Sequence, residues 1–227
     1  MLFGIEWDTS SNLAFAISIL PILMRGLIVT IQATVLGFAI ALVLGLVWAA
    51  LKAAPLKIIS WPATVLTEFF RDTPLLIQLF FLYYVLPEYG LTLPAFMTGA
   101  LALGIQYSAY TAEVYRAGID NVARGQWEAA KACNLTARQT WTHVVFPQAI
   151  PPMIPALANY FIAMFKETPL LSAITVLELM NQAKSVANSS YRYVEPMTLV
   201  GVFFLIISLF SVLLLRWLER RYGRIEG

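Results

Sequence analysis

The feature that most constrains this chain is a series of five long apolar segments. They cover residues 25–51, 61–86, 95–117, 149–178 and 197–217. A helix that crosses the hydrocarbon core of a bilayer needs roughly 20 predominantly apolar residues, and each segment reaches that length. We therefore predict an all-α, polytopic membrane protein with about five transmembrane helices. The fourth segment is the least regular because prolines interrupt it at Pro151, Pro152, Pro155 and Pro169.

Composition supports the same class. Hydrophobic residues make up 59% of the chain, charged residues 12%, and the mean hydropathy is +0.74. A soluble domain of this length normally carries more charge. The net charge of +2 is not concentrated on one helix or tail, so it gives no indication of nucleic-acid binding. A single cysteine, Cys133, excludes an internal disulfide and a multi-cysteine metal site, and we expect no metal.

The basic residues predict the orientation in the membrane, because cytoplasmic loops are enriched in Lys and Arg. With an odd number of spans, ten of the 15 basic residues fall on one side. These ten are Lys52, Lys57, Arg116, Arg124, Lys131, Arg138, Arg216, Arg220, Arg221 and Arg224. The opposite side carries a mixed set, namely Glu6, Asp8, Glu88 and Glu195 with Arg25, Lys184 and Arg192. We expect the N-terminus outside and the C-terminus in the cytoplasm.

A polar island, residues 118–147, interrupts the apolar pattern on the predicted cytoplasmic side. Residues 126–132 are strong helix formers, and Asn134 begins a turn. Thr136 is a suitable N-cap for a second helix from Ala137 to Trp141. We predict a helix–turn–helix that a cytoplasmic partner can push against. The alternative is an amphipathic helix lying on the bilayer surface.

A seven-residue pattern occurs twice. Phe70-Arg71-Asp72-Thr73-Pro74-Leu75-Leu76 is repeated in type by Phe165-Lys166-Glu167-Thr168-Pro169-Leu170-Leu171. Both copies lie within predicted spans, where each proline removes a backbone donor and is expected to break or kink the helix.

Charged side chains at that depth normally face a partner or a water-filled cavity. We expect the two copies to line one translocation pathway, and Glu68 and Gln78 lie close enough in sequence to the first copy to join it. The alternative is that each basic–acidic pair neutralises itself and stabilises a kinked helix. Adjacent residues on a helix do not face each other, which argues against that alternative.

Four segments together resemble a known family. They are Phe-Arg-Asp-Thr-Pro-Leu from Phe70, Ala-Tyr-Thr-Ala-Glu-Val-Tyr-Arg-Ala-Gly from Ala109, Arg-Gly-Gln-Trp-Glu-Ala-Ala from Arg124, and Phe-Pro-Gln-Ala from Phe146. The third is similar to the EAA loop of ABC importer permeases, and the set resembles polar amino acid ABC permeases from about Pro21 to Arg221. Within that family the chain resembles the ectoine and hydroxyectoine permeases.

The resemblance implies a type I importer permease fold in the bacterial cytoplasmic (inner) membrane. Residues 1–227 would form a single permease domain, with a membrane core at about 21–221 and the coupling loop at 118–147. Its partners would be a second, identical or related permease, two cytoplasmic ATPase subunits that hold ATP and Mg, and an extracytoplasmic solute-binding protein. The chain itself would bind no cofactor.

The resemblance also implies roles for particular residues. Coupling to the ATPase would fall to Arg124, Gly125, Glu128, Ala129, Ala130, Asn134 and Pro147, and the pathway to Glu68, Arg71, Asp72, Thr73, Pro74, Gln78, Lys166, Glu167, Thr168 and Pro169. Two positions depart from the family pattern. Asn134 replaces a glycine that serves a left-handed turn, for which asparagine is the next best residue. Pro169 stands where many relatives have serine.

Enzymatic functions find no support. The chain has no Gly-x-x-x-x-Gly-Lys-Ser/Thr segment for a P-loop. Its only histidine, His143, lies in the polar island, where we expect it to pack at the interface with the motor. We predict a transport subunit, driven by a separate ATPase through alternating access, for a polar amino acid or a similar zwitterion. The alternative is a secondary transporter or channel that works without ATP, for which charges within the membrane are also expected. A non-transporting scaffold would leave the repeated motif unexplained.

Overall fold

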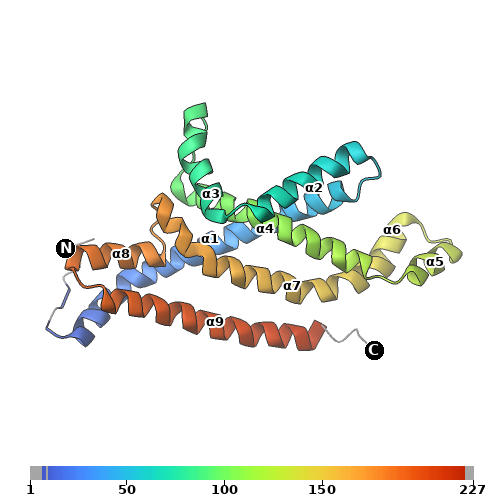
Figure 1. Ribbon diagram of the computed structural model, residues 1–227. Helices are drawn as coiled ribbons and strands as arrows, with labels where there is room; N and C mark the ends of the chain where they lie inside the picture. The colour runs from blue at the N-terminus through green and yellow to red at the C-terminus, as the bar shows by residue number, and fades with distance from the viewer. Residues whose placement is uncertain (1–6, 9, 223–227) are drawn as a thin grey trace. The chain divides into compact units, whose positions relative to one another are not determined.

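The computed structural model describes residues 7–8 and 10–222 (Figure 1). Glu6 and Arg224, which enter the prediction of orientation, lie outside the described residues. Regular structure in the described part is entirely helical. The α-helices are α1 (Asn12–Lys52), α2 (Lys57–Asp72), α3 (Leu75–Phe80), α4 (Ala95–Asp120), α5 (Arg124–Ala132), α6 (Ala137–Gln139), α7 (Phe146–Glu167), α8 (Leu179–Ser190) and α9 (Val194–Tyr222). Two π-helical turns, η1 (Phe81–Val85) and η3 (Thr140–Val145), and two 3₁₀ segments, η2 (Leu86–Tyr89) and η4 (Thr168–Ile174), complete it. The predicted all-α class is confirmed.

The membrane-spanning capacity lies in a few of these helices. By length and composition, α1 and α9 are each apolar enough to cross a bilayer. Two interrupted pairs, Lys57–Asp72 with Leu75–Tyr89 and Ala137–Ile174 with Leu179–Ser190, also qualify if each pair forms one span. Helix α4 covers the third predicted span and has 26 residues, but it is too polar to qualify. Its polar side chains Thr98, Gln106, Ser108 and Thr111 are buried, which is how a helix inside a bundle accommodates them.

The first helix is longer than the sequence pattern predicts. It begins at Asn12, where the backbone N–H of Ala14 donates to the hydroxyl of Ser11 at 3.0 Å. Hydropathy places the start of the span near residue 25, with Arg25 in the connection before it. Instead the helix runs through Pro21 and the exposed Arg25. The hydroxyl cap at Ser11 supplies a start signal that the hydropathy pattern does not show.

The described residues divide into two compact units, and α1, α4, α7 and α9 each contribute to both. The first unit comprises residues up to Ala39, Thr73–Gly104 and Ala163–Phe210. Its core packs α1 against α8, α9 and the end of α7, through Phe15, Ile19, Ile22, Leu23, Leu27, Phe165, Leu179, Ala183, Val186 and Val200.

Two contacts fix the start of α8 in this unit. The buried carboxylate of Glu178 accepts hydrogen bonds from the backbone N–H groups of Met180 and Asn181, at 2.8 and 2.7 Å, and so caps the helix. The N–H of Leu179 donates to Thr30 Oγ1 at 3.1 Å. A Cβ on Gly26 would lie 2.8 Å from the Cα of Leu179, so only glycine permits this approach.

The second unit comprises Ile40–Asp72, Ile105–Ile162 and the part of α9 from Ser211. In it the C-terminal half of α1 packs on α4. Thr111 Oγ1 donates to the carbonyl of Ala41 at 2.8 Å, and Trp48 Nε1 donates to Ser108 Oγ at 3.1 Å. Ser108 and Thr111 of α4 therefore bond to α1. This unit also carries the polar island.

Candidate functional site

The polar island forms a helix–turn–helix, as predicted (Figure 1). Helix α5 carries the Glu-Ala-Ala segment and ends at Ala132, and the next helical segment begins at Ala137. Both belong to the second unit.

The turn depends on Asn134. This residue has φ +56°, in the left-handed region that favours glycine and tolerates asparagine. The N–H of Asn134 donates to the carbonyl of Lys131 at 2.9 Å, and that of Leu135 donates to Ala130 at 3.0 Å. These two bonds form a Schellman motif, which satisfies the last carbonyls of α5. The left-handed turn expected at this position is confirmed.

The second helix of the pair begins with a capping box. Thr136 Oγ1 accepts from the N–H of Gln139 at 3.4 Å, while the N–H of Thr136 donates to Gln139 Oε1 at 2.9 Å. The prediction of Thr136 as N-cap is confirmed, and the Gln139 half of the box adds to it.

This second helix does not end at Trp141, where the sequence pattern predicts its end. It continues through a π-helical turn, η3, into α7, so that Pro147 lies inside a continuous helix. The N–H of Phe146 donates to the carbonyl of Trp141, five residues back. Proline has no N–H and would crowd the carbonyl four residues before it, and the wider register relieves this. The predicted turn is therefore joined rigidly to α7.

Two tryptophans hold α5 against the second helix. The rings of Trp127 and Trp141 meet edge to face, with centroids 5.3 Å apart. They cover a small core made of Val122, Val145, Ala149 and Met153. Ala130 is 3% exposed and faces inward. The last alanine of the Glu-Ala-Ala segment thus serves packing.

The opposite face of α5 is open. Arg124, Gly125, Glu128 and Ala129 are exposed, and nothing lies within 4 Å of a Cβ built on Gly125. Among the described residues Glu128 forms no ion pair or side-chain hydrogen bond. His143 is exposed as well, and its Nδ1 lies 3.2 Å from the carbonyl of Gln139 in its own helix. The structure therefore presents a carboxylate and a guanidinium on a supported helix.

Each copy of the repeated motif interrupts a helix at the same position. Helix α2 ends at Asp72, Pro74 has extended backbone with ψ 136°, and α3 begins at Leu75. Helix α7 ends at Glu167, and the chain continues as the 3₁₀ segment η4 with Pro169 in its first turn. The predicted break at each proline is confirmed.

The first copy is braced by hydrogen bonds. The buried Gln78 donates from Nε2 to the carbonyl of Thr73 at 3.1 Å, which occupies its amide at the break. Arg71 pairs with Glu68 at 3.4 Å and not with its neighbour Asp72, which is exposed. Arg71 is therefore paired with Glu68, three residues earlier on the helix, and not with the adjacent Asp72.

An aromatic group lies beside Arg71, which sequence reasoning missed. Its guanidinium lies 6.0 Å from the centre of the Tyr110 ring, whose hydroxyl donates to the carbonyl of Arg71 at 3.4 Å. Tyr110 stacks on Tyr160 with centroids 5.3 Å apart. A cation beside stacked tyrosines suits a small zwitterion, because the cation attracts its carboxylate and the rings attract its ammonium group.

In the second copy, Lys166 is exposed and Glu167 is half-buried. Thr168 is fully buried and donates from Oγ1 to the carbonyl of Phe165 at 2.7 Å. Its hydroxyl is thereby committed to the backbone at the helix end.

Sequence reasoning also missed a charged cluster between helices. Lys52, at the end of α1, pairs with Glu113 of α4 and donates to Thr67 Oγ1 of α2 at 3.2 Å. Arg116 lies 4.0 Å from the same carboxylate. The sequence identifies Lys52 only as a loop charge, because periodicity does not show which distant residues pair. For Glu113 the sequence favours a contact between helices or a position at the end of a span, and the structure shows the contact between helices.

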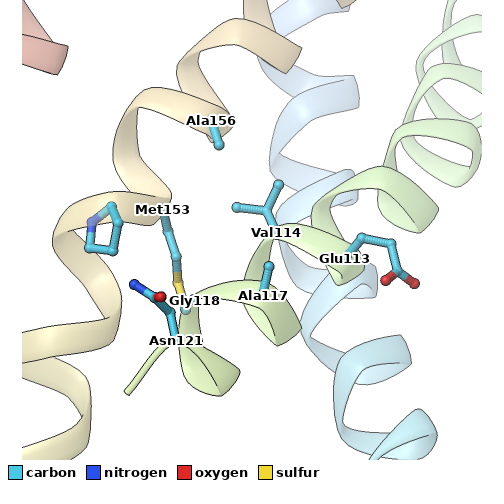
Figure 2. Close-up of a pocket in the computed structure, with 8 residues that line it drawn as sticks. Glu113, Val114, Ala117, Gly118, Asn121, Met153 and Ala156 are labelled. Atoms are coloured by element: carbon cyan, nitrogen blue, oxygen red, sulfur yellow. The ribbon is translucent and has the colours of Figure 1, made fainter. Parts of the chain in front are cut away.

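A cavity of about 450 Å³ lies in the second unit, between α4 and α7 (Figure 2). Its lining is Glu113, Val114, Ala117, Gly118, Asn121, Pro152, Met153 and Ala156. Figure 2 shows the Met153 side chain reaching toward Gly118, while the Glu113 carboxylate points away from it. The lining is mainly apolar, so this cavity has little of the chemistry that a charged solute requires.

Comparisons with known proteins agree with this geometry. The family model of the binding-protein-dependent transport system inner membrane component matches residues 41–224. The chain is 55% identical to the "Probable amino-acid ABC transporter permease protein y4tG" of Sinorhizobium fredii, over 95% of this chain and 94% of that protein. It is 33% identical to the L-cystine transport system permease protein TcyB of Bacillus subtilis, over 96% and 93%.

Among solved structures, a chain from the crystal structure of an amino acid ABC transporter with histidines matches with a TM-score of 0.86 and 38% identity. The match covers 94% of this chain and all of that one. A chain from an inward-facing MetNI methionine ABC transporter shares the fold, with a TM-score of 0.68 at 18% identity, over 87% of this chain and 96% of that one. The chain therefore belongs to the family of binding-protein-dependent transport system inner membrane components and has the type I importer permease fold.

Proposed function

We propose that this chain is the membrane-spanning permease subunit of an ATP-driven ABC importer for a polar amino acid or an amino-acid-like zwitterion. Membership of its family supports a role in membrane transport, and the names of its relatives include amino-acid and L-cystine permeases. Ectoine and hydroxyectoine, which are cyclic zwitterions, remain among the proposed solutes.

The observation that carries the proposal is the exposed face of α5 on a rigid support. The Schellman turn at Asn134 and the Trp127–Trp141 contact fix α5 to a helix that continues through Pro147 into α7. A force applied at Glu128 would therefore reach a membrane helix instead of bending a loop. Separate cytoplasmic ATPase subunits, which hold ATP and Mg, would apply it.

The pathway is proposed to use the two interrupted helices. Arg71 supplies positive charge for the carboxylate of a solute, and Tyr110 with Tyr160 supplies aromatic faces for its cation. Lys166, at the second interruption, remains among the proposed pathway residues. A second permease and an extracytoplasmic solute-binding protein complete the proposed assembly. The chain would supply transport but no ATP hydrolysis of its own.

The test is solute uptake by vesicles that contain this chain, its permease partner and the ATPase. Vesicles are loaded with ATP and Mg or with a non-hydrolysable analogue, and labelled polar amino acids and ectoine are added outside with the binding protein. The proposal predicts uptake of at least one of these solutes with ATP and none with the analogue. Uptake that follows a proton or sodium gradient without ATP would overturn it in favour of a secondary transporter.

A matched pair of variants tests the pathway. Arg71→Gln is expected to raise the solute concentration needed for half-maximal uptake by about tenfold, since a charged hydrogen bond contributes roughly 1.5–3 kcal/mol. Arg25→Gln, which changes an exposed arginine in the first half of α1, is the control and is expected to behave like the unaltered chain. Equal effects of the two substitutions would remove Arg71 from the pathway.

A further inference from the structure

A second pocket in the same unit has a different character from the apolar cavity. It encloses about 670 Å³ at the end of α1 and the start of α2, and its lining is Lys52, Lys57, Ile58, Ser60, Trp61, Thr64 and Arg116. Three of these residues are cations, and two carry hydroxyl groups, of which that of Thr64 donates to the carbonyl of Ser60 at 2.9 Å. The carboxylate of Glu113 is already bonded to Lys52 and lies 4.0 Å from Arg116, and the lining itself contains no carboxylate. The pocket therefore keeps an excess of positive charge.

The backbone adds to this preference for an anion. Helix α2 begins at Lys57, after Leu56, a residue without a side-chain oxygen that could cap the first turn. A helix N-terminus carries partial positive charge and unpaired N–H groups. Because α2 has 16 residues and its first turn lines the pocket, this charge reinforces that of the lysines.

An apolar stripe runs from the pocket along α2. Ile58, Trp61, Val65 and Phe69 are 82%, 70%, 46% and 58% exposed, and their spacing of three and four residues places them on one face of the helix. The stripe covers 12 residues, and its first and last Cα atoms are about 16 Å apart at 1.5 Å per residue. An acyl chain lying on it would have its headgroup at the basic pocket. A small soluble anion has no apolar part that could contact such a stripe.

We propose that this pocket and the apolar face of α2 bind an anionic phospholipid, with its phosphate among Lys57, Arg116 and the start of α2 and an acyl chain along Ile58 to Phe69. Basic pockets beside membrane helices bind anionic headgroups, and tryptophan is favoured where headgroups meet acyl chains. The lining of this pocket includes neither Arg71 nor any residue of α5. The site requires that the chain be a membrane protein, but it does not depend on the solute or on the ATPase.

The experiment titrates the full chain in detergent micelles with dioleoyl phosphatidylglycerol or dioleoyl phosphatidylcholine and counts bound lipid by native mass spectrometry. The pocket variant is Lys57→Gln with Arg116→Gln. The matched control is Arg216→Gln with Arg220→Gln, which removes the same charge from exposed positions on α9. Lys52 is left unchanged because it pairs with Glu113.

The unaltered chain is expected to bind phosphatidylglycerol at least about tenfold more tightly than phosphatidylcholine. The pocket variant is expected to bind phosphatidylglycerol about tenfold more weakly than the unaltered chain, because each Lys or Arg near an anionic headgroup strengthens binding. The control variant should keep the preference. Lys57→Glu, a single change at an exposed position that disturbs no packing, should also lower the preference for phosphatidylglycerol over phosphatidylcholine.

Three results would overturn the proposal. One is equal binding of the two lipids, and another is an equal loss in the pocket and control variants. The third is displacement of bound phosphatidylglycerol by millimolar inorganic phosphate as effectively as by more of the same lipid. That result would show an anion pocket in which the acyl chain has no role. Trp61→Ala distinguishes a lipid site from a simple anion pocket, because the proposal predicts that it weakens lipid binding and leaves phosphate binding unchanged.

Discussion

At the scale of single residues, Asn134 is the departure from the family pattern whose effect the structure explains. Its φ of +56° costs glycine nothing and asparagine little, whereas a β-branched residue is strained there. The sequence was enough to predict this turn, because the position, the residue type and the following Thr136 all agree. The Schellman hydrogen bonds to Ala130 and Lys131 show why it is rigid.

Asn134→Val should therefore destabilise the turn by about 1–2 kcal/mol, and Asn134→Gly should leave it intact. The measurement is hydrogen exchange at the amide of Leu135, which donates to Ala130. Ala132→Val adds the same branched side chain at an exposed helical position of α5 and serves as the control. If Asn134→Val and Ala132→Val exchange at the same rate, the left-handed conformation is not important for the turn.

At the scale of elements, the Trp127–Trp141 contact determines whether α5 moves with α7. The ring centroid of Trp141 also lies 5.3 Å from that of Phe146, beside the π-helical turn before Pro147. The sequence predicted two helices and a turn, but it did not predict their union with α7. Proline usually signals a helix end, and only the observed i to i−5 bond shows how the helix passes it.

Trp141→Ala should speed hydrogen exchange in α5 by about 30- to 150-fold, because loss of a half-buried aromatic ring costs about 2–3 kcal/mol. The protection of α8 should not change. Trp217→Ala, at a residue 53% exposed on α9, is the matched control. Unchanged exchange in α5 would mean that other contacts hold it.

The Lys52–Glu113 pair is a second connection between elements, since it joins α1, α2 and α4 within one unit. The Lys52 side chain is 3% exposed and that of Glu113 is 39% exposed. A double-mutant cycle with Lys52→Met and Glu113→Gln should give a coupling of about 1–2 kcal/mol in thermal unfolding. The more exposed Glu68–Arg71 pair should give less than about 0.5 kcal/mol in the same cycle. Equal couplings would contradict the structural role of the buried lysine.

At the scale of the whole molecule, composition and hydropathy were enough for the all-α class and for the two long apolar helices, α1 and α9, but not for five spans, since at most four helices or bent helix pairs qualify in the described residues. They did not give the start of α1 at Asn12, which depends on a single hydroxyl cap, or the partners of the buried Ser108 and Thr111 of α4, which bond to Trp48 and Ala41 of α1. Local propensity and periodicity predict elements, whereas pairing between distant side chains appears only in the fold. The clustering of lysine and arginine still predicts orientation, with the island in the cytoplasm.

The single cysteine gives a direct test of that orientation. Cys133 is exposed in the turn after α5. A membrane-impermeant maleimide should label it in inside-out vesicles and fail to label it in right-side-out vesicles or intact cells. In a Cys133→Ser background, Tyr191→Cys, at a residue 88% exposed, should show the reverse. Labelling of Cys133 from outside would invert the predicted topology.

The measurement that tests the central claim most directly is solute-stimulated ATP hydrolysis by the reconstituted transporter carrying Glu128→Lys. The control is Glu219→Lys, an equal charge reversal at an exposed position on α9. We predict that Glu128→Lys lowers both hydrolysis and uptake by about tenfold or more, because reversing a charge at an interface opposes a complementary charge on the partner, while the control keeps both. Uptake and hydrolysis that are indifferent to Glu128 would contradict the role of α5 as the element that couples this chain to its ATPase.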